Sequence, residues 1–175
     1  MKQQTQTNKI EWKDLSNGKI KFISYEFVFK NGKRKRKKIK FNKNPKKLQG
    51  GSGGPQGIKI DRLFFEFNFN EQVALLWHEL FHCRSMFLPK MLWLEIKYDF
   101  GDKKSFWKEE FEADEYSALQ NNIQDCLSYL RIIKKIYQEN SSLYNAKTHP
   151  PIDERIKAVE KLEAKKGEIK LVRRK

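Results

Sequence analysis

The sequence predicts an α+β fold in which a small sheet packs against several helices. Residues 21–30 and 37–41 have the apolar alternation and β-branched or aromatic content of strands. The C-terminal two thirds contain long runs without Gly or Pro, and such runs are typical of helices. At 175 residues, the chain is long enough to bury the core of one domain.

The two predicted strands form a hairpin with a strongly basic composition. Asn31 and Gly32 lie between them, and this dipeptide favours a tight turn. Residues 1–60 hold 17 Lys or Arg against 3 acidic residues, whereas residues 61–175 hold 20 against 19. The net charge of +15 therefore belongs to the N-terminal third. Its centre is a run of six consecutive cations: Lys33, Arg34, Lys35, Arg36, Lys37 and Lys38.

Two interpretations of this basic run remain open. In the first, it is a solvated hairpin whose lysines also oppose edge-to-edge pairing of sheets. In the second, it is a patch that binds nucleic acid or an acidic protein. The nearby Phe27 and Phe29 alternate like core residues, so they do not favour base stacking. The charge alone identifies no partner.

The segment "LQGGSGGPQG" divides the chain, and its composition predicts a flexible loop at 48–57 without helix or strand. No Lys-Ser or Lys-Thr pair follows it, as a phosphate-binding loop would require. Residues 58–69, with their alternating Ile and Phe residues, are predicted to form the edge strand of the sheet. We therefore divide the chain into a basic hairpin region at 1–47, the Gly-rich loop, a main domain at 58–165 and a basic tail at 166–175.

The run "LLWHELFHCR" lies in a predicted helix that Asn70 caps and that ends before Pro89. On this helix His78 and His82 are one turn apart, so both imidazoles can reach one cation. Glu79 is rotated by about 100° from His78, which would place its carboxylate beside a metal-bound water. The alternative is a helix with two polar histidines beside a surface groove.

A second helix is predicted at 106–119. Glu110 and Asp114 share one stripe of it with small residues, which permit close approach of another helix. Glu110 suits a third metal ligand, and Asp114 can accept the free ring N–H of a coordinating histidine. The alternative is a merely amphipathic acidic helix, and the remaining acids are expected to face solvent: Glu109, Glu112 and Glu115.

The third histidine, His149, precedes two prolines that hold its backbone extended. A rigid loop suits a donor that must meet a developing oxyanion. Arg155 is expected to anchor this segment rather than to take part in chemistry. Two more helices are predicted, one from about Asn121 to Tyr137 and one from Asp153.

The motifs "HELFH", "EFEAD" and "THPPIDERI", in this order, resemble the signatures of the CAAX prenyl protease and HtpX family of gluzincin metallopeptidases. The resemblance covers roughly residues 70–160. It implies that residues 58–165 form a zincin-like catalytic domain. It further implies one Zn²⁺ per chain on His78, His82 and Glu110, a catalytic Glu79, a supporting Asp114 and a transition-state role for His149.

The chain is shorter than known members of this family, whose catalytic core is surrounded by membrane segments. Only 27 residues, 83–109, separate the second histidine from Glu110, and none of them forms a span. The start of the chain has no apolar core of a secretory signal, and its two cysteines do not suggest a disulfide framework. We therefore expect a soluble, cytoplasmic protein.

These features predict a zinc-dependent endopeptidase that acts on a protein or peptide. An extended substrate would pair with the edge of the sheet built from residues 58–69. The alternative is a basic protein that binds nucleic acid or another polyanion on the same scaffold, with little or no peptidase activity. The sequence gives no oligomeric state.

Overall fold

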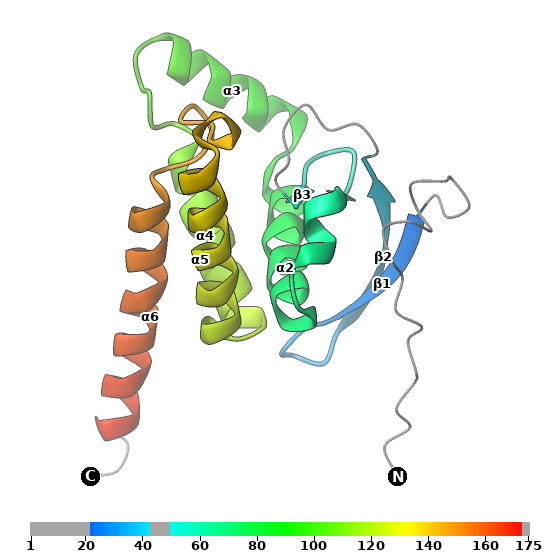
Figure 1. The fold of residues 1–175 in the computed structure, drawn as a ribbon, viewed down its shortest axis with the longest axis vertical. Coiled ribbons are helices and arrows are strands. Elements are labelled where there is room, and N and C mark those ends of the chain that lie inside the picture. Colours follow the sequence, from blue (N-terminus) through cyan, green and yellow to red (C-terminus); the bar gives the residue numbers. More distant parts are fainter. Residues whose placement is uncertain (1–21, 43–49, 173–175) are drawn as a thin grey trace.

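The computed structural model describes residues 22–42 and 50–172, with side chains to residue 163 (Figure 1). Parts of the predicted hairpin region, at 1–21 and 43–47, and residues 173–175 of the predicted tail therefore lie outside the described residues. The described residues contain four strands: β1 (Phe22–Val28), β2 (Arg34–Phe41), β3 (Gly51–Ser52) and β4 (Lys59–Ile60). They also contain five α-helices: α2 (Phe69–Ser85), α3 (Leu88–Asp99), α4 (Trp107–Gln120), α5 (Ile123–Glu139) and α6 (Ile152–Val172). Two short 3₁₀ helices complete the list, η1 (Arg62–Glu66) and η2 (Ser141–Leu143). The predicted α+β class is confirmed.

The four strands form one mixed sheet in the order β1-β2-β4-β3. Strands β1 and β2 pair antiparallel, as the sequence predicts, and Gly32 turns the chain between them with a φ of +80°. Strand β4 runs parallel to β2, and β3 closes the sheet as an antiparallel edge. The hairpin is longer than predicted, because its second strand begins at Arg34 rather than at Lys37.

Helix α2 lies at the centre of the molecule, between the sheet on one side and α4, α5 and α6 on the other (Figure 1). On the sheet side, Phe27 is fully buried and its ring lies 4.9 Å from that of Trp77. On the other side, α2 packs against α4 and α5. Because both sides of α2 are covered, most of its buried residues are apolar; the exceptions are Glu71 of the capping box and the polar side chains of the site.

The predicted strand at 58–69 is mostly wrong. It ends at Ile60, because the Asp61 carboxylate accepts a hydrogen bond from the backbone N–H of Leu63 (2.9 Å) and starts η1. Phe64 and Phe67 are buried, as core residues of a turn of helix rather than of a strand. The edge of the sheet is formed instead by β3, within the segment that we predicted to be an irregular loop.

The predicted bounds of the histidine-containing helix also need correction. Its N-cap is Asn68 rather than Asn70, and Glu71 completes a capping box with it. The helix ends at Ser85, and α3 follows at once, although we predicted no helix there. Pro89 lies in the first turn of α3, where its missing N–H costs no hydrogen bond.

The last two predicted helices are confirmed within two residues at each predicted end, as α5 and α6. Helix α6 continues to Val172, through most of the segment predicted as a basic tail. Among the described residues, none of the helices combines the length and apolar character needed to cross a membrane.

Candidate metal centre

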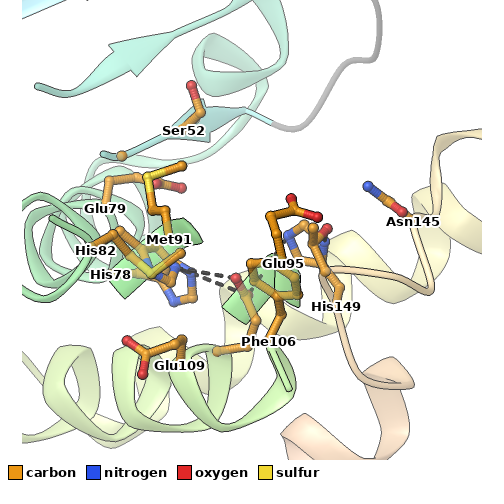
Figure 2. Close-up of a pocket in the computed structure, with 15 residues that line it drawn as sticks. Ser52, His78, Glu79, His82, Met91, Glu95, Phe106, Glu109, Asn145 and His149 are labelled. Carbon is orange, nitrogen blue, oxygen red and sulfur yellow. Dashed lines mark hydrogen bonds and ion pairs between the residues drawn. The ribbon is translucent and has the colours of Figure 1, made fainter. Parts of the chain in front are cut away.

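His78 and His82 point into the same space from successive turns of α2 (Figure 2). Their Nε2 atoms lie 3.1 Å apart, and both residues are buried. Glu110 reaches the same point from α4, with Oε1 3.2 Å from His82 Nε2 and Oε2 3.5 Å from His78 Nε2. The three predicted ligands are therefore together, and they could hold a metal ion.

The packing of α2 against α4 explains this convergence. Ser117 Oγ donates a hydrogen bond to the backbone carbonyl of Ala74 (2.7 Å). About one turn before Ser117 on α4, Asp114 contacts His78. One further turn towards the start of α4, Glu110 lies beside His82. The two helices are thus antiparallel in this region, and the i, i+4 spacing on each produces matching pairs. Small side chains at the contact allow the close approach.

Asp114 and Arg155 support the ligands from behind. His78 Nδ1 lies 2.9 Å from Asp114 Oδ1, which fixes the proton on Nδ1 and leaves the lone pair of Nε2 for a cation. Arg155 donates to both oxygens of Asp114, from Nε (2.7 Å) and Nη2 (2.8 Å), and its Nη1 lies 3.2 Å from Glu110 Oε2. The expected contact of Asp114 with His78 is therefore present, and Arg155 ties its own segment to both carboxylates.

The electrostatics of the centre favour a cation between the ligands. Burial alone would lower the pKa of His78, but hydrogen bonds and charges of Asp114 and Glu110 raise it to about 10. Burial would raise the pKa of Glu110, yet the neighbouring His149, His82 and Arg155 hold it well below its usual value. The carboxylates thus stabilise a positive charge at the imidazoles, which a proton or a metal ion can supply.

Glu79 is buried on the next face of α2, against the edge strand β3 (Figure 2). A side chain at Gly53 would place its Cβ 2.1 Å from the backbone oxygen of Glu79, and one at Gly51 would lie 3.2 Å from Glu79 Oε1. Burial raises the pKa of the Glu79 carboxyl group. Glu79 therefore lies beside the candidate ligands, as predicted. The chain at Gly51 and Gly53 packs so closely against this part of α2 that only glycine fits at these positions.

His149 lies across the centre from Glu79, on the loop between η2 and α6 (Figure 2). Its Nε2 is 3.7 Å from Glu110 Oε2, and its Nδ1 is 2.7 Å from Thr148 Oγ1. Burial lowers the pKa of His149, which favours the neutral ring. The indole N–H of Trp107 donates to a backbone carbonyl of the same loop and holds it against α4.

A cleft of about 290 Å³ opens onto the three candidate ligands. It is lined by Glu79 and His149, by the edge strand β3, and by further residues that we did not predict. These are Ser52 of β3, Met86 at the end of α2, Met91 and Glu95 of α3, and Phe106 just before α4. Because we did not predict α3, no pattern in the sequence indicated that Met91 or Glu95 faces the site.

Glu109 is the one acid of α4 whose predicted environment is clearly wrong. It is buried rather than solvent-facing, and its Oε1 forms an ion pair with Lys90 Nζ at 2.7 Å. Glu112 and Glu115 are more exposed, as expected. Lys90 belongs to α3, which we did not predict, so the buried ion pair of Glu109 could not be predicted either.

The basic residues of the hairpin do not line the cleft. Arg34, Arg36 and Lys38 alternate with Lys35 and Lys37 on β2, so the run is divided between the two faces of the sheet. Lys35 lies opposite Phe27 in the register, on the face turned to α2, and the charge of Lys37 lowers its pKa.

No protein-family model, curated protein or solved structure matches the chain. The fold and the site together define an α+β protein with a candidate metal centre. Two histidines of one helix and a glutamate of the antiparallel helix form this centre, and a buried glutamate lies beside it on the wall of a cleft.

Proposed function

We propose that the protein is a zinc-dependent endopeptidase of the gluzincin type. One observation carries the proposal: the three candidate ligands converge at the base of a cleft whose wall also contains the buried Glu79. A site that only stabilised the fold would need no acid at this position. The ordered motifs described above support the same class of enzyme.

The donor set fits zinc. Imidazole nitrogens and a carboxylate oxygen are the ligands of gluzincin sites, and donors about 2.0–2.1 Å from a tetrahedral ion lie about 3.3 Å apart. Here the two histidine Nε2 atoms are 3.1 Å apart, and Glu110 lies 3.2 Å from His82 Nε2 through Oε1 and 3.5 Å from His78 Nε2 through Oε2. The second His82 nitrogen, Nδ1, is buried and has no hydrogen-bond partner among the described residues, so the ring is oriented by its Nε2 contacts.

A zinc ion held by these residues would lower the pKa of a bound water to about 7 and polarise a peptide carbonyl. Glu79 would accept the proton of the attacking water and pass it to the leaving amine. The raised pKa of its buried carboxyl group suits this proton exchange near neutral pH. Asp114 keeps the proton of His78 on Nδ1, and His149 offers Nε2–H to the oxyanion.

The substrate would lie along β3. This strand pairs with β4 on one side only, and Gly51 and Ser52 line the cleft beside Glu79. An extended polypeptide could extend the sheet there by backbone hydrogen bonds. The predicted edge pairing is thus retained in the proposal, but on Gly51–Ser52 rather than on residues 58–69.

The test combines metal content with cleavage of an unstructured protein. Wild type should contain about one zinc per chain and cleave, and chelation should abolish the cleavage. Glu79→Gln should retain the fold and the zinc, yet lose most turnover because it removes the proton carrier and none of the ligands. Equal hydrolysis by Glu79→Gln, or no cleavage by the zinc-loaded wild type, would disprove the proposal.

A second candidate function, binding of nucleic acid or another polyanion, is favoured by the outer face of the hairpin. On this face Arg34, Arg36 and Lys38 are exposed, and among the described residues the acid paired with them is Glu26, 3.1 Å and 3.8 Å from the two arginines. The resulting stripe carries more positive charge than its acidic partner can neutralise.

This second function predicts a salt-dependent interaction. Wild type should bind DNA or RNA without sequence preference, with an affinity that falls steeply as salt rises. Changing Lys33, Arg34, Lys35 and Arg36 to Gln should flatten that dependence and leave hydrolysis of an uncharged peptide unchanged. Lack of retention on nucleic acid at low salt would instead identify the stripe as solubilising or as a site for an acidic protein.

A further inference from the structure

The ring nitrogens of His78 and His149 have partners of different kinds. His78 Nδ1 lies 2.9 Å from a carboxylate oxygen of Asp114, and an ionised carboxylate can only accept a hydrogen bond. His149 Nδ1 lies 2.7 Å from the hydroxyl of Thr148, which can donate as well as accept. A neutral imidazole carries one proton. The partner of one nitrogen therefore determines whether the other nitrogen is a donor or a lone pair.

The surroundings of His149 Nε2 decide which nitrogen of this ring is protonated. Nε2 lies 3.7 Å from Glu110 Oε2, and the same oxygen lies 3.2 Å from Arg155 Nη1, which stabilises the ionised carboxylate. Burial lowers the pKa of His149 and so favours the neutral ring. A proton on Nε2 is attracted by the carboxylate, whereas a lone pair there would be repelled. Nδ1 is then the acceptor, and the Thr148 hydroxyl is its donor.

We propose that Thr148 is a positioning residue, whose hydroxyl donates to His149 Nδ1 and keeps the ring proton on Nε2. This inference rests on the proposed peptidase function, in which His149 offers Nε2–H to the oxyanion. The opposite tautomer would present a lone pair to that negative charge and repel it. With Nε2 protonated, His149 also lacks the lone pair that would make it a further metal ligand, although it lines the same cleft.

The backbone beside Thr148 is held by contacts that do not involve its hydroxyl. The backbone N–H of His149 donates to the carbonyl of Asn145 (2.9 Å), and the Tyr144 hydroxyl donates to the carbonyl of His149 (3.0 Å). Removal of the Thr148 hydroxyl should therefore affect the imidazole ring and leave the course of the loop unchanged.

The experiment compares full-length wild type with two variants. Thr148→Val keeps the shape of the side chain and removes the hydroxyl, whereas Thr148→Ser keeps the hydroxyl. Long-range ¹H–¹⁵N correlation spectra of the metal-free proteins locate the ring proton, at a pH where the same spectra show a neutral ring. The signals of His149 are assigned by their loss in His149→Gln.

Wild type and Thr148→Ser should carry the ring proton of His149 on Nε2, with Nδ1 hydrogen-bonded. In Thr148→Val the Nδ1 resonance should move to that of an acceptor without a donor, and the second tautomer should become populated. With zinc bound, Thr148→Val should lower kcat about tenfold at an unchanged KM, because one hydrogen bond no longer holds a group that acts on the transition state. Thr148→Ser should retain most of kcat, and zinc content should be equal in wild type and both variants.

The proposal would be overturned by a wild-type spectrum with the proton on Nδ1, or by a Thr148→Val variant with an unchanged spectrum and unchanged kcat. An equal loss of kcat in Thr148→Ser and Thr148→Val would show that the hydroxyl is not the acting group. The proposed peptidase function fails separately: if zinc-loaded wild type does not cleave while its spectrum shows Nε2–H, the hydrogen bond from Thr148 is established without that function.

Discussion

The acidic side chains of the centre differ in their partners, and these partners determine their roles. Asp114 is held by two hydrogen bonds from Arg155 and by one from His78, all in a fully buried environment. Glu79 instead lies against Gly51 of β3 and Gly53, which follows that strand, and it lines the cleft. The first acid can therefore position a ligand, and the second is free to exchange a proton.

Asp114→Asn should weaken zinc affinity about 10- to 100-fold, as loss of a carboxylate behind a coordinating histidine commonly does. It should also lower the free energy of unfolding, because Arg155 loses its buried anionic partner; breaking such a pair costs about 3–5 kcal/mol. Zinc titration calorimetry and urea unfolding would measure the two effects. The matched control is Glu112→Gln on the same helix, whose exposed pair with Lys108 should contribute about 0.5 kcal/mol or less.

An unchanged zinc affinity in Asp114→Asn, with Glu112→Gln also unchanged, would mean that Asp114 serves the fold alone. A loss of stability without a loss of affinity would give the same conclusion. The two measurements are needed together because Arg155 also contacts Glu110.

The segment of β3 and the residue after it, Gly53, packs tightly against α2 beside the candidate centre. At Gly53 an added Cβ would lie 2.1 Å from a backbone oxygen of α2, and backbone can yield only if this segment moves. Gly54, the next residue, has open space around its Cβ position and no positive φ. The two neighbouring glycines therefore offer a matched comparison of position.

Gly53→Ala should displace β3 from α2 and lower peptide hydrolysis at least about tenfold, since a shift of about 1 Å near a reacting group can cost a hundredfold. It should bind zinc normally, because no ligand belongs to β3. Gly54→Ala should retain both activity and stability. Full activity in Gly53→Ala would show that the position of β3 does not matter for catalysis.

The elements that carry the candidate metal ligands could be predicted from the sequence because their signals are local. An i, i+4 pair of histidines and an i, i+4 pair of acids each define one face of a helix, and long runs without Gly or Pro define the helices themselves. The three ligands converge because two such faces pack together, and the small residues of α4 indicated that contact. Asp114 could be assigned for the same reason.

The missed elements depend on signals with two meanings. A proline such as Pro89 is compatible both with the end of the preceding helix and with the first turn of a new one. We considered only the end of the preceding helix. The aromatic run at 64–67 fits a strand or a turn of buried helix, and the capping by Asp61 decided between them. Glu109 was placed wrongly because its partner Lys90 comes from the helix that was missed. Pairing of a two-residue strand such as β3 has no sequence signal of its own.

At the scale of the whole molecule, the candidate centre joins two parts of the fold. The sheet and α2 form one side, and α4, α5 and α6 form the other (Figure 1). His78 and His82 belong to the first part, Glu110 and Asp114 to the second, and Arg155 of α6 contacts both acids. A metal ion bound by three candidate ligands from two helices would therefore link the stability of the chain to the occupancy of the site.

Removal of the metal should lower the thermal stability of the protein. With free zinc at about 100 times its Kd, binding adds about 2.7 kcal/mol to the free energy of unfolding, which corresponds to about 5–10 °C in Tm for a chain of this size. Chelation should remove that increment in a calorimetric scan, and added zinc should restore it. The control is His78→Ala/His82→Ala, whose Tm should be insensitive to chelator whatever its own value. A double variant that still contained full zinc would disprove the ligand assignment, and a wild type with the same Tm at zero and saturating zinc would show that the ion does not bind the folded chain in preference to the unfolded one.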